Sequence, residues 1–192
     1  MILEPQKVPH QEYPIEKNMK IIGIKYLTKM IEMKKTKTAI VSGYFDPLHV
    51  GHLEYFKLAK ELADELIVIV NNDIQCAIKK GRPFMEEQDR LEIVFHLDMV
   101  DEAILASDTG KDVVETIMSI NSFKPFNELI FCNGGDRNAT NSPEYAACQE
   151  LGIKWVDNLG EKIRSSSDLT GLVEKQKQQS LVDTLTHYTS DT

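Results

Sequence analysis

The stretch TAIVSGYFDPLHVGHLEYFKLAKELADELIVIVNN, residues 38–72, decides the fold. Residues 38–45 are apolar enough for a buried first strand, and residues 65–72 hold a continuous apolar run that suits a strand buried on both faces. Between these runs, residues 52–63 carry leucine and phenylalanine near helical spacing. A strand, an amphipathic helix and a second strand in this order predict a βαβ unit with parallel strands.

The same alternation continues downstream. Ser142 followed by Pro143 marks the start of the last helix, and residues 79–85 are expected to form a loop. We therefore predict the α/β class, with a Rossmann-like open parallel sheet of about five strands and helices on both faces. The further helices are expected at residues 86–100, 113–123 and 142–152, and the further strands at residues 102–106, 128–133 and 153–158.

The sequence divides into three segments. Residues 1–37 form an N-terminal extension, in which isoleucine and leucine at helical spacing predict a helix. Residues 38–175 contain the strand and helix pattern and are the expected folded domain. Residues 176–192 form a polar C-terminal tail with too few large apolar groups to offset the entropy cost of ordering.

Charge and composition exclude several classes of protein. Among 192 residues, 30 are acidic and 22 basic, and the formal net charge of −8 has the wrong sign for binding nucleic acid. No apolar run approaches the ~20 residues of a membrane span, and no signal-peptide pattern is present. Three cysteines without a Cys-x-x-Cys pair suggest buried thiols. We expect a cytoplasmic protein without membrane or nucleic-acid partners.

The turn after the first strand is the candidate site. In GYFDPLHVGH, residues 43–52, glycine and proline lie between a strand and a helix, and His49 and His52 share one face of the first helical turn. The helix N-terminus offers free N–H groups and a positive dipole end, which attract phosphate. Gly51 removes a side chain where a triphosphate would approach the backbone. The turn therefore predicts a phosphate-binding cradle with two imidazole groups.

Residues 43–52 also resemble the first signature, G-x-F-D-P-x-H-x-G-H, of the cytidylyltransferase-like nucleotidyltransferases. IRSSSDL, residues 163–169, resembles the Ile-Ser-Ser/Thr-Ser/Thr element of that family. The resemblance extends from about Thr38 to Leu172 and makes residues 38–175 a nucleotidyltransferase domain. It implies an enzyme that transfers AMP or CMP from an NTP to a phosphorylated small molecule and releases pyrophosphate.

Two further stretches resemble family elements. Residues 79–105 are similar to a basic loop that leads into an Arg-bearing helix, and residues 131–144 are similar to a Gly-Gly-Asp element. Asn133 stands where heptose-type enzymes usually have lysine, which argues against that sugar phosphate as the acceptor. The resemblance implies catalytic roles for His49, His52, Lys80 and Arg90. It implies nucleotide binding by Gly43, Tyr44, Phe45, Asp46, Gly51, Asp136, Ser165, Ser166 and Ser167, and substrate binding by Lys79, Arg82 and Arg137.

The resemblance also bears on cofactors and assembly. Mg²⁺ is expected with the NTP, held mainly by phosphates and water, so no protein residue is assigned to a metal. The partners implied are an NTP and a phosphorylated acceptor, and a homodimer is the assembly that the resemblance suggests. Asp46 is open to two interpretations, because its carboxylate would either contact substrate or hold the turn.

Several alternatives stay open or are disfavoured. The sequence does not decide between ATP and CTP, although IRSSS is closer to adenylyl enzymes. A nucleotide-binding protein of this fold without turnover is the main alternative function. A dinucleotide-dependent dehydrogenase lacks G-x-G-x-x-G after the first strand, and a zinc site lacks ligands beyond the two histidines. A class I aminoacyl-tRNA synthetase would need an anticodon-reading domain.

Overall fold

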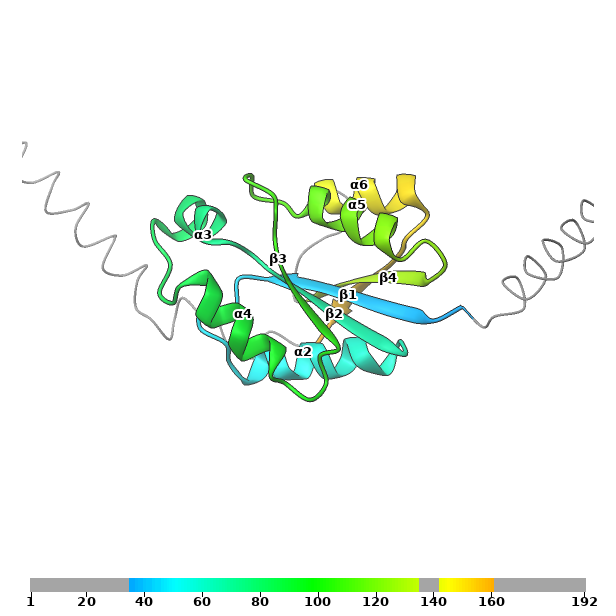
Figure 1. The fold of residues 1–192 in the computed structure, drawn as a ribbon, viewed down its shortest axis with the longest axis horizontal. Coiled ribbons are helices and arrows are strands. Elements are labelled where there is room, and N and C mark those ends of the chain that lie inside the picture. The colour runs from blue at the N-terminus through cyan, green and yellow to red at the C-terminus, as the bar shows by residue number, and fades with distance from the viewer. Residues whose placement is uncertain (1–34, 135–141, 161–192) are drawn as a thin grey trace, which may run out of the picture. The chain divides into compact units, whose positions relative to one another are not determined.

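A computed structural model of the chain describes residues 35–134 and 142–160 (Figure 1). These residues contain a five-stranded sheet of order β3-β2-β1-β4-β5, and every neighbouring pair is parallel. The predicted Rossmann-like α/β sheet is therefore confirmed. The strands are β1 (Lys37–Gly43), β2 (Glu65–Val70), β3 (Glu102–Leu105), β4 (Glu128–Gly134) and β5 (Lys154–Leu159).

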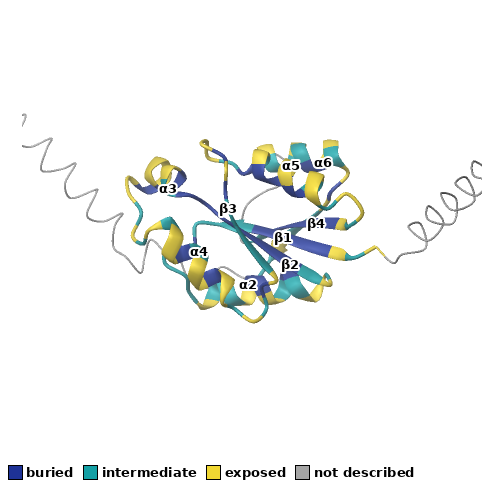
Figure 2. Cartoon of the chain, viewed as in Figure 1, coloured by how far each residue is buried: buried dark blue, intermediate teal, exposed yellow. Residues whose placement is uncertain are grey.

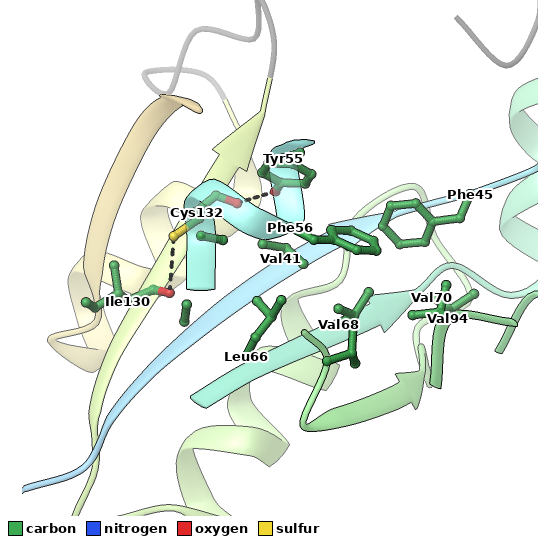
Figure 3. Close-up of a cluster of buried hydrophobic side chains, with 13 residues drawn as sticks. Val41, Phe45, Tyr55, Phe56, Leu66, Val68, Val70, Val94, Ile130 and Cys132 are labelled. Carbon is green, nitrogen blue, oxygen red and sulfur yellow. Dashed lines mark hydrogen bonds between the residues drawn. The ribbon is translucent and has the colours of Figure 1, made fainter. Parts of the chain in front are cut away.

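Helices cover both faces of the sheet, as predicted (Figures 1 and 2). One face packs against α2 (Val50–Glu61) and α4 (Glu87–Phe95), and its core is the cluster drawn in Figure 3. The other face packs against α5 (Val114–Phe123) and α6 (Pro143–Leu151). The exposed sides of these helices show as the yellow segments of Figure 2.

The apolar run of β2 explains why the sheet has two covered faces. Leu66, Val68 and Val70 belong to the core on the α2 side, whereas Ile67 and Ile69 belong to the core on the α5 side. All five are buried. Successive side chains of a strand point to opposite faces, so a strand with apolar residues at every position has to be covered twice.

One helix departs from the sequence expectation. Residues 73–80 form α3 (Asp73–Lys80), so the loop expected from residue 79 begins only at Gly81. Asn72 accepts a hydrogen bond from the backbone N–H of Gln75, whose side chain in turn accepts one from the Asn72 N–H. This reciprocal capping starts the helix, and Gly81, at φ +83°, ends it.

Other boundaries agree with the sequence to within a few residues. β1 starts at Lys37 and ends at Gly43, because Phe45 at φ +48° has left the extended conformation. Ser142 caps α6 by accepting a hydrogen bond from the Tyr145 N–H, with Pro143 at the first position, as predicted. The three cysteines are free and buried, which was also expected, and burial raises the pKa of both Cys132 and Cys148 to about 12.

Several predictions fall outside the described residues. They are the helix of the N-terminal extension, the C-terminal tail, Asp136 and Arg137, and the serines at 165, 166 and 167. The part of the chain that is described contains no helix long and apolar enough to cross a membrane.

Candidate active site

The histidine turn lies at the carboxyl end of the central strand. It leaves β1 at Gly43 and enters α2 at Val50, beside the point where the strand order switches from β1 to β4. The Gly43 carbonyl accepts a hydrogen bond of 2.9 Å from the Asn71 N–H, which ties the turn to the end of β2. In open parallel sheets this switch point is where ligands bind.

The two histidines are held in one arrangement. The backbone N–H of His49 donates to Nδ1 of His52 at 3.2 Å, and the two rings stack with centroids 3.7 Å apart. Because Nδ1 accepts this bond, the proton of the neutral His52 ring is on Nε2. Burial, then the charges of His49 and Lys80, lower the pKa of His52 to about 3. The lowered pKa favours the neutral form of His52 at physiological pH, with its Nε2–H as a donor.

Phe45 supports the histidine ring from the sheet side. Its ring meets the His52 ring edge-on with centroids 5.0 Å apart. It also meets the Phe56 ring edge-on, with centroids 5.0 Å apart (Figure 3). Its φ of +48° lies in a region that non-glycine residues rarely adopt. Such strained conformations persist only where the surroundings enforce them, and they cluster at functional sites.

Two glycines of the turn are needed for space. A Cβ at Gly43 would lie 2.7 Å from two atoms of the Phe45 ring. A Cβ at Gly51 would lie 3.3 Å from the His49 ring. Both glycines therefore keep the aromatic and imidazole rings where they are.

Asp46 joins the turn to the loop before α4. Its carboxylate is fully buried and accepts hydrogen bonds from the Phe84 N–H at 3.0 Å and the Met85 N–H at 2.8 Å. Of the two interpretations that the sequence left open, these contacts favour holding the turn.

The two predicted lysines lie in the last turn of α3. Lys80 is buried, and its ammonium donates to the Asp46 carbonyl at 2.7 Å and lies 3.4 Å from the Asp46 carboxylate. Lys79 is exposed, and its ammonium lies 4.1 Å from the centroid of the Tyr44 ring. The lysines therefore occupy different environments although they are adjacent in sequence.

Arg90 is buried under the site. Its side chain donates to the backbone carbonyls of Met85 at 3.0 Å, Tyr44 at 2.8 Å and Asn71 at 2.6 Å. It also pairs with the Asp73 carboxylate at 2.6 Å. With 1% of its surface exposed, Arg90 joins the ends of β1 and β2 to α3 and α4. The guanidinium of Arg90, for which the resemblance implies a catalytic role, is thus occupied by backbone carbonyls and a carboxylate in this structure.

The structure thus brings most of the predicted residues together around the turn. Those gathered there are Gly43, Tyr44, Phe45, Asp46, His49, Gly51, His52, Lys79, Lys80 and Arg90. Arg82 is exposed in the loop that follows α3. Nucleotide or substrate binding by each of these residues stays a prediction.

Tyr55 is a site residue that the sequence reasoning missed. It lies on α2 three residues after His52, and its hydroxyl donates to the backbone carbonyl of Cys132 at the end of β4 (Figure 3). A Cβ at Gly134 would lie 3.0 Å from the Tyr55 ring. The helix that presents His52 is therefore also attached to β4, on the other side of the switch point. The sequence signal that could have found Tyr55 is its spacing of three residues from His52, which places both on one side of the helix.

Asn72 and Gln75 were also missed. The Asn72 side chain donates to the carbonyls of Ala106 and Asp108, and Gln75 donates to the carbonyl of Asp112. These bonds attach α3 to the loop after β3. The described residues contain no group of three or more His, Cys, Asp or Glu side chains arranged to hold a metal ion.

The open parallel sheet, with paired histidines at a helix start beside its switch point, defines a Rossmann-like nucleotidyltransferase. The sequence matches the cytidylyltransferase-like family over residues 40–160, and the chain belongs to that family. It is accordingly an enzyme of the nucleotidyltransferase type, as the sequence predicted.

Curated relatives include several FAD synthases. The chain is 39% identical to that of Thermococcus sibiricus over 107 residues, which cover 55% of this chain and 68% of the relative. It is 42% identical to that of Pyrococcus abyssi over 82 residues, covering 42% of this chain and 55% of the relative. It is 42% identical to the FAD synthase of Methanothrix thermoacetophila over 89 residues, which cover 46% of this chain and 60% of the relative. The chain thus spans between about half and two thirds of these relatives.

Solved structures share the fold. A lipopolysaccharide core biosynthesis protein from Thermoplasma volcanium aligns with a TM-score of 0.54 and 27% identity, over 65% of this chain and 98% of that one. A bifunctional NMN adenylyltransferase/ADP ribose pyrophosphatase from Francisella tularensis aligns with a TM-score of 0.50 and 13% identity, over 69% of this chain and 40% of that one. The second similarity shows the fold alone.

Proposed function

We propose that the chain is an FMN adenylyltransferase, which transfers AMP from ATP to FMN to form FAD and pyrophosphate. The observation that carries the proposal is the 39–42% identity to FAD synthases over 82 to 107 residues. The match to the cytidylyltransferase-like family, over residues 40–160, includes the histidine turn. FMN is a phosphorylated small molecule, so this reaction is one of those that the sequence allowed. Of ATP and CTP, which the sequence left open, ATP is the nucleotide that this reaction uses.

The chemistry proceeds by in-line attack. An oxygen of the FMN phosphate attacks the α-phosphorus of ATP and forms the new P–O bond, while the bond from the α-phosphorus to the bridging oxygen breaks. The electron pair of that bond leaves with pyrophosphate. The attacking phosphate is already anionic at neutral pH, so no proton has to be removed from it. A neutral, donating imidazole fits this reaction better than a general base does.

His52 supplies the donor in this proposal. Its Nε2–H is directed at a non-bridging oxygen of the α-phosphate, where charge grows in the transition state. The stacked His49 ring and the positive end of the α2 dipole attract the adjoining phosphates. Gly43 and Gly51 leave room for the Phe45 and His49 rings beside His52.

Asp46, Lys80 and Arg90 act mainly as positioning residues in this proposal. Asp46 and Arg90 both hold the Met85 backbone, while Lys80 fastens α3 to Asp46 and places a positive charge near His52. The predicted contacts of Asp136 with the ribose or base and of the serines at 165, 166 and 167 with the β- and γ-phosphates complete the proposed nucleotide site.

Mg²⁺ fits the site as a companion of the triphosphate. We expect this ion to keep several waters and to bind mainly through phosphate oxygens, as Mg²⁺ commonly does. When bound, the ion supplies charge neutralisation at the β- and γ-phosphates.

The test is FAD formation by the purified chain. FMN is incubated with Mg²⁺ and ATP, CTP, GTP or UTP in turn, and FAD and pyrophosphate are quantified by chromatography. We expect FAD from ATP, its loss in His52→Ala, and retention in His96→Ala, which changes an exposed histidine on α4's C-terminal side. Preference for CTP would refute adenylyl transfer. Pyrophosphate release with another phosphorylated acceptor but not with FMN would refute the acceptor.

A further inference from the structure

The helix α3 is held against the rest of the fold mainly by polar side chains. Its two large apolar residues, Ile74 and Ile78, are 55% and 46% exposed. Its buried residues are Gln75, Cys76 and Lys80. A helix of a globular protein normally turns its apolar side towards the core. The position of α3 therefore depends on hydrogen bonds at its two ends.

Gln75 provides several of the bonds at the beginning of the helix. Its buried amide oxygen accepts hydrogen bonds from the Asn71 side chain at 2.8 Å and from the Asn72 N–H at 3.1 Å. Its amide nitrogen donates to the Asp112 carbonyl at 2.7 Å. Because the amide accepts on one side and donates on the other, neither a carboxylate nor an apolar group can replace it.

Asn72 also uses both ends of its amide. The oxygen accepts from the Gln75 N–H at 2.9 Å, and the nitrogen donates to the carbonyls of Ala106 at 2.9 Å and Asp108 at 2.7 Å. Both carbonyls follow β3, and the buried Asp108 carboxylate is in turn bonded to backbone N–H groups at the start of α5. Two amide side chains thus fix the start of α3 to the carboxyl end of the sheet.

The other end of this helix carries Lys80. The Lys80 ammonium donates to the Asp46 carbonyl, within the histidine turn, at 2.7 Å. A helix of eight residues is a rod of about 12 Å, short enough to move as one body. A shift at the start of α3 therefore also moves the ammonium that fastens the turn.

We propose that Gln75 and Asn72 are positioning residues that set the Lys80 ammonium against the histidine turn. The proposal rests on the proposed function, in which Lys80 fastens the turn that presents His52 to the α-phosphate. Neither amide touches a substrate in this arrangement. Their effect on the reaction passes through Lys80.

A positioning role predicts a loss of turnover. Gln75→Met keeps a similar volume but removes the hydrogen bonds of the amide. It is expected to lower kcat for FAD formation about ten- to a hundredfold, because small displacements at a reacting centre have effects of this size. Asn72→Ser keeps an acceptor for the helix start but loses the donors to the loop after β3, and is expected to lower kcat less. In Lys80→Met, adding Gln75→Met has little further effect, because the coupled partner is already lost.

The stability-matched control is Thr38→Val. The Thr38 hydroxyl is buried at the other end of β1, where it donates to Glu65 at 3.1 Å and accepts from Asn127 at 2.8 Å. This variant is expected to lower the melting temperature, as Gln75→Met does, and to retain kcat at a temperature below both transitions. If Gln75→Met retains kcat, or if Thr38→Val loses as much, the positioning role is refuted. Effects of Gln75→Met and Lys80→Met that multiply in the double variant also refute it.

A second measurement does not depend on turnover. A buried, hydrogen-bonded ammonium exchanges its protons slowly, so its signal is recorded in proton–nitrogen spectra and assigned by its absence in Lys80→Met. The Lys80 signal is expected to move in Gln75→Met and in Asn72→Ser, and to stay in place in Thr38→Val. Asn72→Ser, the milder change, decides both measurements if Gln75→Met does not fold.

The two proposals fail in different ways. An unchanged Lys80 signal in the amide variants, in an enzyme that makes FAD, overturns the inference alone. A wild-type chain that makes no FAD from any NTP overturns the proposed function instead, and the ammonium signal then still decides whether the amides place Lys80.

Discussion

His49 and His52 are joined twice: the backbone N–H of His49 donates to Nδ1 of His52 at 3.2 Å, and the two rings stack 3.7 Å apart. The first contact orients the His52 ring and fixes its tautomer, and the second places the His49 ring beside it. The pair therefore forms one rigid unit at the start of α2, rather than two independent side chains.

This relationship predicts different outcomes for two amide substitutions. His52→Asn can accept the His49 N–H through its oxygen but has no donor at the Nε2 position, so we expect kcat to fall ~10²–10³-fold. His52→Gln has an amide N–H near the Nε2 position and is expected to retain more activity than the asparagine variant. Steady-state kinetics with ATP and FMN measure both. Equal loss in the two variants would show that the donor position is not what matters.

The lowered pKa of His52 predicts a stability change with pH. The folded state binds the proton only near pH 3, whereas the unfolded state binds it near the ordinary 6.5. Between these values the unfolded state carries more protons, so the free energy of unfolding falls as pH is lowered from 6.5 towards 3, by at most about 1.4 kcal/mol per pH unit. Urea denaturation of the wild type and His52→Gln across this range measures it. If the free energy of unfolding changes with pH in the same way in both proteins, the lowered pKa of His52 is contradicted.

Arg90→Lys is expected to lower the free energy of unfolding by ~3–5 kcal/mol. A lysine cannot reproduce the fork that serves the carbonyls of Met85, Tyr44 and Asn71, and buried acceptors would lose their partners. Urea denaturation measures the loss, with Arg82→Lys in the exposed loop as the matched control, expected within ±0.5 kcal/mol. Unchanged stability with a raised KM for ATP would instead support direct triphosphate binding.

Gly43→Ala is expected to reduce both stability and activity. The added methyl would lie 2.7 Å from the Phe45 ring, and displacing that ring also moves the edge contact that supports His52. Overpacking of this kind costs ~1–3 kcal/mol. Thermal denaturation and kcat measure the two effects. Gly110→Ala is the control, because the nearest atom to its Cβ is a carboxylate oxygen at 3.4 Å.

Asp46→Asn is expected to loosen the loop before α4. The amide nitrogen cannot accept from the Phe84 or Met85 N–H, so part of the present hydrogen bonding is lost. Hydrogen exchange at those two amides should become faster in the variant, while exchange in α5 stays unchanged. Unaltered protection at Phe84 and Met85 would contradict the holding role of Asp46.

The sheet could be predicted because its signal is local. β2 is apolar at nearly every position, and Ser142 with Pro143 marks the start of α6 by short-range chemistry. α3 was missed although its capping pair, Asn72 and Gln75, and its terminal Gly81 were visible in the sequence. Residues 73–78 were assigned to no element, and the two lysines at the end of the helix were assigned to the loop of residues 79–85.

The sequence predicted which residues lie at the site better than it predicted what each of them contacts there. The positions of His49 and His52 follow from their spacing, because three residues on a helix start determine a shared face. The surroundings of Arg90 depend on three carbonyls from separate segments, which only the folded chain brings together. No local pattern distinguishes an arginine that meets phosphate from one enclosed by backbone.

The central place of β1 has a consequence for synthesis on the ribosome. β1 can pair with β2 as soon as β2 has emerged, but its other edge pairs with β4, whose residues are made much later. Until then that edge presents open N–H and C=O groups, which invite pairing with a neighbouring chain. The nascent protein therefore passes through a stage in which the histidine turn is already in place while half of the central strand still needs protection, by chaperones or by rapid elongation.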